Sequence, residues 1–232
     1  MPNHALLNNV DHKDVRVVAR RGASYGDNVM LALTFSSEFR DLQAHYPIVF
    51  RKTADGTSFE PLVLLGFQEG ENLFLGPNGW DASYVPLAIA RQPFLIGMAS
   101  GEPLVHIDMG SARVSKTEGE PIFLPHGGNS EYLEQVNSML LSIHQGVQST
   151  PPFIAALLEH ALLESFVVDI ELDDGSQNRL AGFYTINEDK LNARSGEVIA
   201  QLHQNGYLQA IYMVLASMSN FRALIERKNR HA

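Results

Sequence analysis

The stretch from His45 to Met98 decides the fold of this chain. It reads HYPIVF at residues 45–50, FEPLVLLGF at 59–67, ENLFLGPNGW at 71–80 and DASYVPLAIARQPFLIGM at 81–98. Short runs of branched and aromatic residues alternate here with turn signals such as Asp55-Gly56 and Gly76-Pro77-Asn78-Gly79. Because this is the most apolar part of the N-terminal half, we expect these runs to form the sheet on which the other elements lie.

The same reasoning predicts more strands along the N-terminal half. Further strands are expected at residues 15–18, 29–35, 93–98 and 104–109. Between the strands at 29–35 and 46–50, Ser36 or Ser37 can cap a short helix, with Phe39 and Leu42 as its inward residues.

From Asn129 the spacing of apolar residues becomes helical. Helices are expected at 132–143, 153–162, 187–206 and 208–225, with a break at 146–152 and a hairpin at 166–186. A lone two-stranded ribbon is only marginally stable, so this hairpin should join or cover the first sheet.

Strands before residue 125 and helices after it predict an α+β fold, in which a mainly antiparallel sheet from the N-terminal half is packed by helices of the C-terminal half. We expect one domain over residues 1–232, with a boundary near 125–130 as the alternative. No internal repeat or heptad series is present.

The composition indicates which classes of partner are disfavoured and in which compartment the protein is expected. The net charge is −9, which disfavours nucleic acid and anionic lipid as partners. There is no cysteine, so disulfides and thiolate metal sites are excluded. The N-terminus has no basic, apolar signal pattern, and no apolar run approaches the roughly 20 residues that cross a bilayer. We therefore expect a soluble cytoplasmic protein with no membrane or nucleic-acid partner.

One motif suggests a hydrolase. Gly22-Ala23-Ser24-Tyr25-Gly26 matches G-x-S-x-G, in which Ser24 would be the nucleophile on a turn between a strand and a helix. Here the motif leads into an expected strand, and few residues precede it. An ordinary glycine-rich loop explains the pattern better than a nucleophile does.

A second motif suggests an iron enzyme. His106-Ile107-Asp108 lies on an expected strand, so the imidazole and the carboxylate would point to the same face. This is the H-x-D half of an iron-binding triad of the cupin-like oxygenases, which also needs a distal histidine. The alternative is a solvent-facing or capping pair, and we expect no metal or other cofactor.

The aromatic residues of the central stretch are the strongest indication of binding. Tyr46, Trp80 and Tyr84 lie near turns and beside prolines, and Arg91 follows closely. Exposed tryptophan and tyrosine are favoured at recognition surfaces, and a guanidinium can hold a carboxylate or peptide carbonyls. We predict that these four residues bind a ligand. The alternative is that the rings fill the core.

Many short segments, in order along most of the chain, resemble the SapC family, a bacterial group named for a surface-layer-associated gene. The likeness is carried by YPIVF at 46–50, LGF at 65–67, NLF at 72–74, Trp80, YVP at 84–86, RQPF at 91–94, STPPF at 149–153, LAGFY at 180–184, DKL at 189–191, GYL at 206–208 and LASM at 215–218.

The resemblance implies a link to surface-layer or envelope processes, and it supplies no catalytic residues. We therefore expect a non-catalytic binding or accessory protein that engages a protein, a peptide or a small ligand. The iron enzyme with His106 and Asp108, and the hydrolase with Ser24, are the alternatives. The sequence leaves the oligomeric state open.

Overall fold

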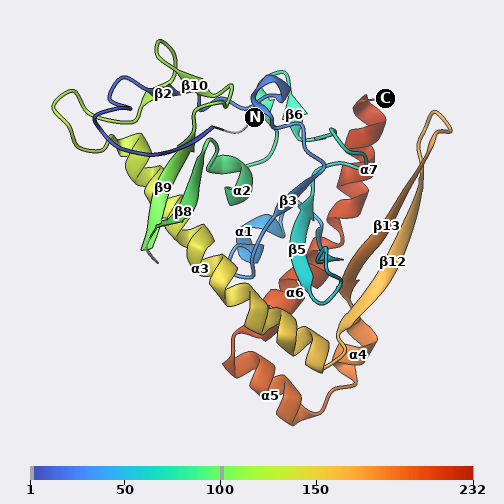
Figure 1. Cartoon of the computed structure of the whole chain (residues 1–232). Helices are drawn as coiled ribbons and strands as arrows, with labels where there is room; N and C mark the ends of the chain where they lie inside the picture. Colours follow the sequence, from blue (N-terminus) through green and yellow to red (C-terminus); the bar gives the residue numbers. More distant parts are fainter. Residues whose placement is uncertain (1–2, 100–101, 232) are drawn as a thin grey trace. The chain divides into compact units, whose positions relative to one another are not determined.

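A computed structural model of the chain describes residues 3–99 and 102–231 (Figure 1). They divide into two compact units. Unit 1 comprises the chain up to Asp27, Leu75–Asp81 and Leu87–Gln145, and unit 2 comprises Asn28–Phe74, Ala82–Pro86 and the chain from Gly146 onward. The region 125–130 lies inside unit 1. The single domain expected over residues 1–232 stays a prediction.

Unit 1 contains two three-stranded antiparallel sheets, ordered β1-β9-β8 and β10-β2-β11, and the hairpin β6-β7. The strands are β1 His4–Leu6, β2 Arg16–Val17, β6 Leu75–Gly76, β7 Gly79–Trp80, β8 Phe94–Ala99, β9 Glu102–Asp108, β10 Val114–Ser115 and β11 Glu120–Pro121. A 3-10 turn, η1 (Ala23–Tyr25), and the short helix α2 (Leu87–Ala90) complete its regular structure before α3.

The core of unit 1 forms between its first sheet and the first half of helix α3 (Glu131–Glu159). Phe94 and Ile107 pair across β8 and β9 and are fully buried. Leu133, Val136 and Leu140 of α3 join the same cluster, because a spacing of three and four residues places them on one helix face.

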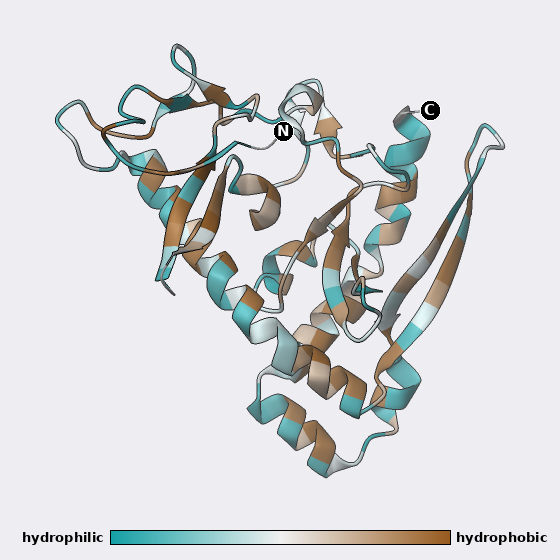
Figure 2. Cartoon of the chain, in the orientation of Figure 1, coloured by the Kyte–Doolittle hydropathy of each residue, from teal (hydrophilic) through white to brown (hydrophobic). Residues whose placement is uncertain are grey.

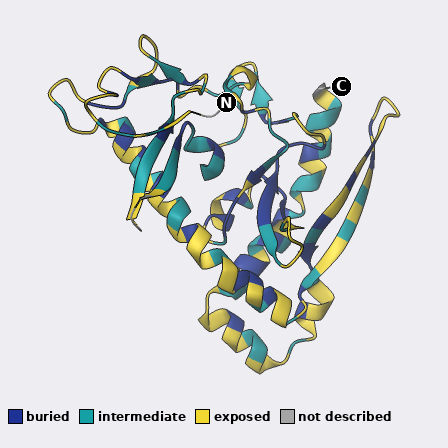
Figure 3. Ribbon diagram, in the orientation of Figure 1, coloured by how far each residue is buried: buried dark blue, intermediate teal, exposed yellow. Residues whose placement is uncertain are grey.

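Unit 2 is built on a five-stranded antiparallel sheet ordered β12-β13-β4-β5-β3. The strands are β3 Leu31–Leu33, β4 Ile48–Lys52, β5 Phe59–Leu64, β12 Leu163–Glu171 and β13 Gln177–Ile186. The late hairpin joins the first sheet as expected, because β13 pairs with β4 at Phe183↔Arg51 and Tyr184↔Phe50. Figure 3 shows that β12, at the edge of the sheet, is mostly exposed or half-buried, whereas β5 is mostly buried.

The helices of unit 2 are α1 Phe39–Leu42, α4 Glu188–Asn192, α5 Gly196–Gln204, α6 Tyr207–Ser217 and α7 Asn220–His231, together with the second half of α3. Phe153 of α3 is fully buried, and its ring contacts Phe39, Phe50 and Tyr207 at centroid distances of 6.1, 6.4 and 5.5 Å. Helix α6 packs on β4 and β13 and buries Ile211. Strands thus dominate the N-terminal half and helices the C-terminal half, so the α+β prediction is confirmed.

The break expected at 146–152 was wrong, because α3 runs unbroken through Pro151 and Pro152. Proline supplies no N–H to the carbonyl four residues earlier, but Val147 is exposed and water can satisfy its carbonyl. The hydroxyls of Ser149 and Thr150 donate to the carbonyl of Gly146 at 2.9 and 2.8 Å. The prolines supply no N–H to the carbonyls of Val147 and Gln148, and both residues are exposed, so the helix passes the two prolines where water is at hand.

Two predicted helices are each divided. Within 187–206 the chain forms α4 and α5 as separate helices, because Ser195 caps α5 by accepting from the backbone N–H of Val198. Asn187 starts α4 as predicted, and its side chain accepts from the Lys190 N–H at 2.8 Å. The last helix divides into α6 and α7, where the Asn220 side chain donates to the Gln43 carbonyl at 2.8 Å.

Among the described residues, one segment, Tyr207–Arg230, is long and apolar enough to cross a membrane, and 28% of its most apolar part is buried. This corrects the expectation that no run approaches that length. A core helix has the same character, and α6 buries Ala210, Ile211 and Val214 within unit 2. Figure 2 shows the segment becoming hydrophilic toward the end of α7.

Candidate functional site

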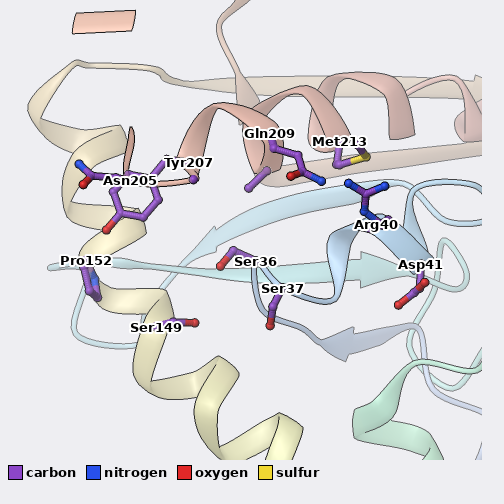
Figure 4. Close-up of a pocket in the computed structure, with 12 residues that line it drawn as sticks. Ser36, Ser37, Arg40, Asp41, Ser149, Pro152, Asn205, Tyr207, Gln209 and Met213 are labelled. Atoms are coloured by element: carbon purple, nitrogen blue, oxygen red, sulfur yellow. The ribbon is translucent and has the colours of Figure 1, made fainter. Parts of the chain in front are cut away.

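A pocket of about 540 Å³ opens in unit 2 (Figure 4). Three segments that are far apart in the sequence line it: the turn and helix at 36–41, the part of α3 at 149–152, and the junction of α5 and α6 at 205–213. The lining residues are Ser36, Ser37, Arg40, Asp41, Ser149, Pro152, Asn205, Gly206, Tyr207, Gln209, Ala210 and Met213.

The first wall follows from helical spacing. Phe35, Glu38, Phe39 and Leu42 are buried, at positions three and four residues apart. The residues between them therefore face outward, and these are the residues that line the pocket from this side. The inward positions of Phe39 and Leu42 are as predicted for this short helix. The predicted cap was wrong, because Glu38, and neither Ser36 nor Ser37, occupies the N-cap position, and no side chain caps the helix.

A buried hydrogen-bond network holds this wall from behind. Glu38 is only 2% exposed, and its carboxylate accepts from the Thr34 hydroxyl at 2.6 Å and from the Tyr84 hydroxyl at 3.1 Å. The Tyr46 hydroxyl in turn donates to the Tyr84 carbonyl. Burial, and next the nearby Glu38, raise the pKa of Tyr84, so its hydroxyl stays a donor at neutral pH.

The second wall depends on a close approach at Gly146. A Cβ at this position would lie 2.1 Å from the Phe35 ring, so only glycine lets α3 come this near. The contact brings Ser149 and Pro152, which lie further along α3, to the pocket opposite the 36–41 segment.

The third wall is the turn between α5 and α6. Gly206 has φ +74°, a left-handed conformation that glycine adopts without strain. It connects Asn205, which ends α5, to Tyr207, which begins α6. Tyr207 packs on Phe153, and Gln209 and Met213 follow along the pocket side of α6.

Two residues of opposite charge line the pocket. Arg40 and Asp41 are both exposed. With the Gln209 amide turned so that its Oε1 faces Arg40, that oxygen accepts from Nε at 3.2 Å and also from Nη2. Figure 4 shows the Arg40 guanidinium directed toward Gln209 and Met213. Within residues 3–99 and 102–231, neither charged side chain has an ionic partner.

The pocket can therefore offer hydroxyls, amides, one guanidinium, one carboxylate and an apolar surface. Its lining has no histidine, cysteine or lysine among the described residues. These groups suit recognition by hydrogen bonds and charge.

The family model for SapC matches residues 7–224 of the 232, which include all three walls of the pocket. The chain belongs to the SapC family. Comparison with curated proteins and with solved structures returned no match.

In this SapC-family chain, the four residues predicted to bind are divided between the units. Tyr46 is fully buried and joined to the half-buried Tyr84 in unit 2, where both act behind the first wall of the pocket. Trp80 is half-buried in the β6-β7 hairpin of unit 1, paired with Leu75. Direct ligand contact by these residues stays a prediction.

Arg91 also belongs to unit 1 and is half-buried. Its Nη1 donates to the Phe94 carbonyl at 2.5 Å, and burial lowers the pKa of its guanidinium. It lines a smaller pocket of about 330 Å³ together with His4 and Asp108. The Phe94 contact gives Arg91 a structural role in the turn before β8.

The residues of the iron hypothesis have local structural partners. The Asp108 carboxylate accepts from the backbone N–H groups of Asn3 and Gly110 at 2.8 and 3.0 Å. The His106 ring lies over Gly97 of the neighbouring strand, where a Cβ would come within 2.3 Å of it. In the part of the chain that the structure describes, no group of three or more His, Asp or Glu is arranged to hold a metal.

Ser24 lies exposed on the 3-10 turn η1, not between a strand and a helix. The loop is fixed at its end by Asp27, whose carboxylate accepts from Arg113 at 2.6 Å, with both side chains fully buried. The strand–turn–helix context that a G-x-S-x-G nucleophile needs is therefore missing at this loop.

Sequence reasoning missed the pocket itself. Two of its walls contain segments already quoted for the family resemblance, 149–153 and 206–208, and this is the signal that was available. Nothing in the sequence alone brings those segments to Arg40 and Asp41, because the approach depends on the packing of α3 against Phe35.

Proposed function

We propose that this member of the SapC family is a non-catalytic binding or accessory protein, and that the pocket of unit 2 holds a peptide, a segment of a partner protein or a small ligand. The observation that carries the proposal is the pocket itself, about 540 Å³ with polar groups from three segments. This volume lies within the range of small-molecule sites, roughly 300–1,000 Å³.

The lining favours binding over catalysis. Its hydroxyls belong to Ser36, Ser37, Ser149 and Tyr207, and among the described lining residues none has a histidine beside it to act as a base. The buried carboxylate of Glu38 is engaged by Thr34 and Tyr84, and so it serves to hold the wall.

We further propose that the protein acts in the cytoplasm and is linked there to surface-layer or envelope processes. The acidic net charge of −9 and the absence of cysteine support the compartment. The link to the surface layer rests on the family name. Trp80 and Arg91 of unit 1 are kept as a proposed contact surface for a protein partner.

The test is a thermal-shift screen of the whole chain against amino acids, dipeptides, sugars and nucleotides, repeated with Ser37→Trp. The bulky ring should fill the pocket and abolish any stabilisation seen with the natural chain. At a concentration 100 times the Kd, a ligand stabilises the folded state by about 2.7 kcal/mol, which is several degrees in Tm for a chain of this size.

Ser142→Trp is the matched control, because Ser142 is an exposed serine of α3 outside the pocket. It should respond to ligands like the natural chain. Ligands that still stabilise Ser37→Trp would place binding elsewhere, and a screen with no stabilising compound would contradict the proposal.

A further inference from the structure

Two charged residues of the pocket, Arg40 and Asp41, indicate which chemical class of ligand it binds. Arg40 and Asp41 are consecutive, carry opposite charge, are exposed, and both line the pocket. Consecutive side chains of a helix do not face each other, and no salt bridge joins Arg40 to Asp41. Among the described residues, Arg40 and Asp41 also have no other ionic partner.

The Arg40 guanidinium is held in place by a neutral group. With its amide turned as described above, Gln209 accepts from Nε and Nη2 of Arg40, which fixes the plane of the guanidinium without neutralising its charge. The Nη1 donors stay available, and a carboxylate is the group that a planar fork of donors binds best. Arg40 is therefore prepared for an anion that the chain itself does not supply.

Asp41 limits the kind of ligand that can carry this anionic group. A ligand carrying only negative charge would bring repulsion from the Asp41 carboxylate, and a purely cationic ligand would meet the same problem at Arg40. A ligand with both charges satisfies both residues. The pocket also has an apolar part, formed by Pro152, Ala210 and Met213.

We propose that the pocket binds a small zwitterion, an α-amino acid or short peptide with an apolar side chain, whose carboxylate is held by Arg40 and whose ammonium group is held by Asp41. This inference rests on the proposed binding function and adds the chemical class of the ligand. The ligand's apolar side chain lies against Pro152 and Met213, and the Ser36 and Ser37 hydroxyls add hydrogen bonds.

The experiment is calorimetric titration of the full chain with leucine, leucyl-leucine and two blocked dipeptides. N-acetyl-leucyl-leucine lacks the ammonium group, and leucyl-leucinamide lacks the carboxylate. Each blocked form should bind about tenfold or more weakly than leucyl-leucine, because one charge-assisted contact is lost. Free leucine and leucyl-leucine show whether the site takes one residue or two.

Variants assign each charge to its residue. Arg40→Gln should weaken leucyl-leucine binding about tenfold or more. It should not weaken the binding of leucyl-leucinamide further, because that ligand has no carboxylate for Arg40 to hold. Asp41→Asn should likewise weaken leucyl-leucine binding. It should not weaken the binding of N-acetyl-leucyl-leucine further, because that ligand has no ammonium group for Asp41 to hold. Arg40→Lys should restore part of the affinity. Arg51→Gln, at an exposed arginine paired with Glu60 outside the pocket, is the control and should bind as the natural chain does.

The outcomes separate the two proposals. If leucine and leucyl-leucine do not bind, or the blocked forms bind equally well, the zwitterion is wrong. The binding function still stands in that case, provided that another compound stabilises the chain and loses its effect in Ser37→Trp. If no compound does so, both proposals fail. Circular dichroism and Tm of each variant exclude unfolding as the cause of lost binding.

Discussion

At Tyr84 a single hydroxyl connects the aromatic stretch to the pocket. It donates to Glu38, which lies two residues before Arg40 and three before Asp41. Tyr46, buried beneath it, holds the Tyr84 backbone in place. Direct ligand contact by Tyr46 and Tyr84 stays a prediction, and in the structure both residues also position the wall that carries the charges.

Replacing Tyr84 by Phe removes one donor from a buried carboxylate, and we expect the free energy of unfolding to fall by about 1–3 kcal/mol. The change also alters the pH dependence. Because the pKa of Tyr84 is raised above its ordinary value of 10.0 in the folded state, the unfolded chain loses this proton first as pH rises. Stability contributed by Tyr84 is thus fully present below pH 10.0 and declines above it.

Urea unfolding at pH 8 and pH 11 measures this effect. The natural chain should lose more stability across that range than Tyr84→Phe does, since the other titrating groups are common to both. Equal losses would mean that neither burial nor Glu38 raises the pKa of Tyr84 in the folded state.

Trp80 offers a second test at the scale of one side chain. Its ring is half-buried, so Trp80→Ala should cost less than the roughly 3–5 kcal/mol typical of a fully buried aromatic. Urea unfolding followed by circular dichroism gives the value. A loss of that full size would make the ring a core residue and remove it from any contact surface.

At the scale of elements, the approach of α3 to the segment before α1 shapes the pocket. Gly146→Ala would force the Phe35 ring or the helix to move, and we expect a loss of about 1–3 kcal/mol together with weaker ligand binding. Gly196→Ala is the matched change, because α5 begins there and nothing lies within 4 Å of an added Cβ.

Gly196→Ala should leave stability unchanged or raise it by about 0.4–1 kcal/mol. Thermal unfolding of the two variants compares them directly. Similar stability for both would show that the contact between Gly146 and Phe35 is loose.

The sequence predicted those elements whose signals are local. The hairpin of β4 and β5, the hairpin of β12 and β13, and the start of α4 at Asn187 are where turn and capping residues placed them. Pro151 and Pro152 misled, because a proline pair normally marks a helix start and here lies inside α3. The pocket could not be predicted, since its walls meet only through packing between distant segments.

At the scale of the whole molecule, the segment Tyr207–Arg230 bears on whether the chain associates with a membrane. Three apolar residues of α6 are buried within unit 2, and α7 carries Arg222, Arg227 and Lys228. Moving these charges into a bilayer would cost about 2.5–3.5 kcal/mol each. We therefore expect the full chain in the supernatant after ultracentrifugation of a cell lysate. Retention in the membrane pellet after an alkaline carbonate wash would contradict this.

The most direct measurement is a nitrogen-15 NMR titration of the full chain with leucyl-leucine. We predict saturable shifts in the backbone amides of Ser37, Arg40, Tyr207 and Gln209, from the first and third walls of the pocket, with the Trp80 indole signal unchanged. Saturable shifts at Trp80 with those four amides unmoved, or no saturable shift anywhere, would contradict the assignment of the pocket as the binding site.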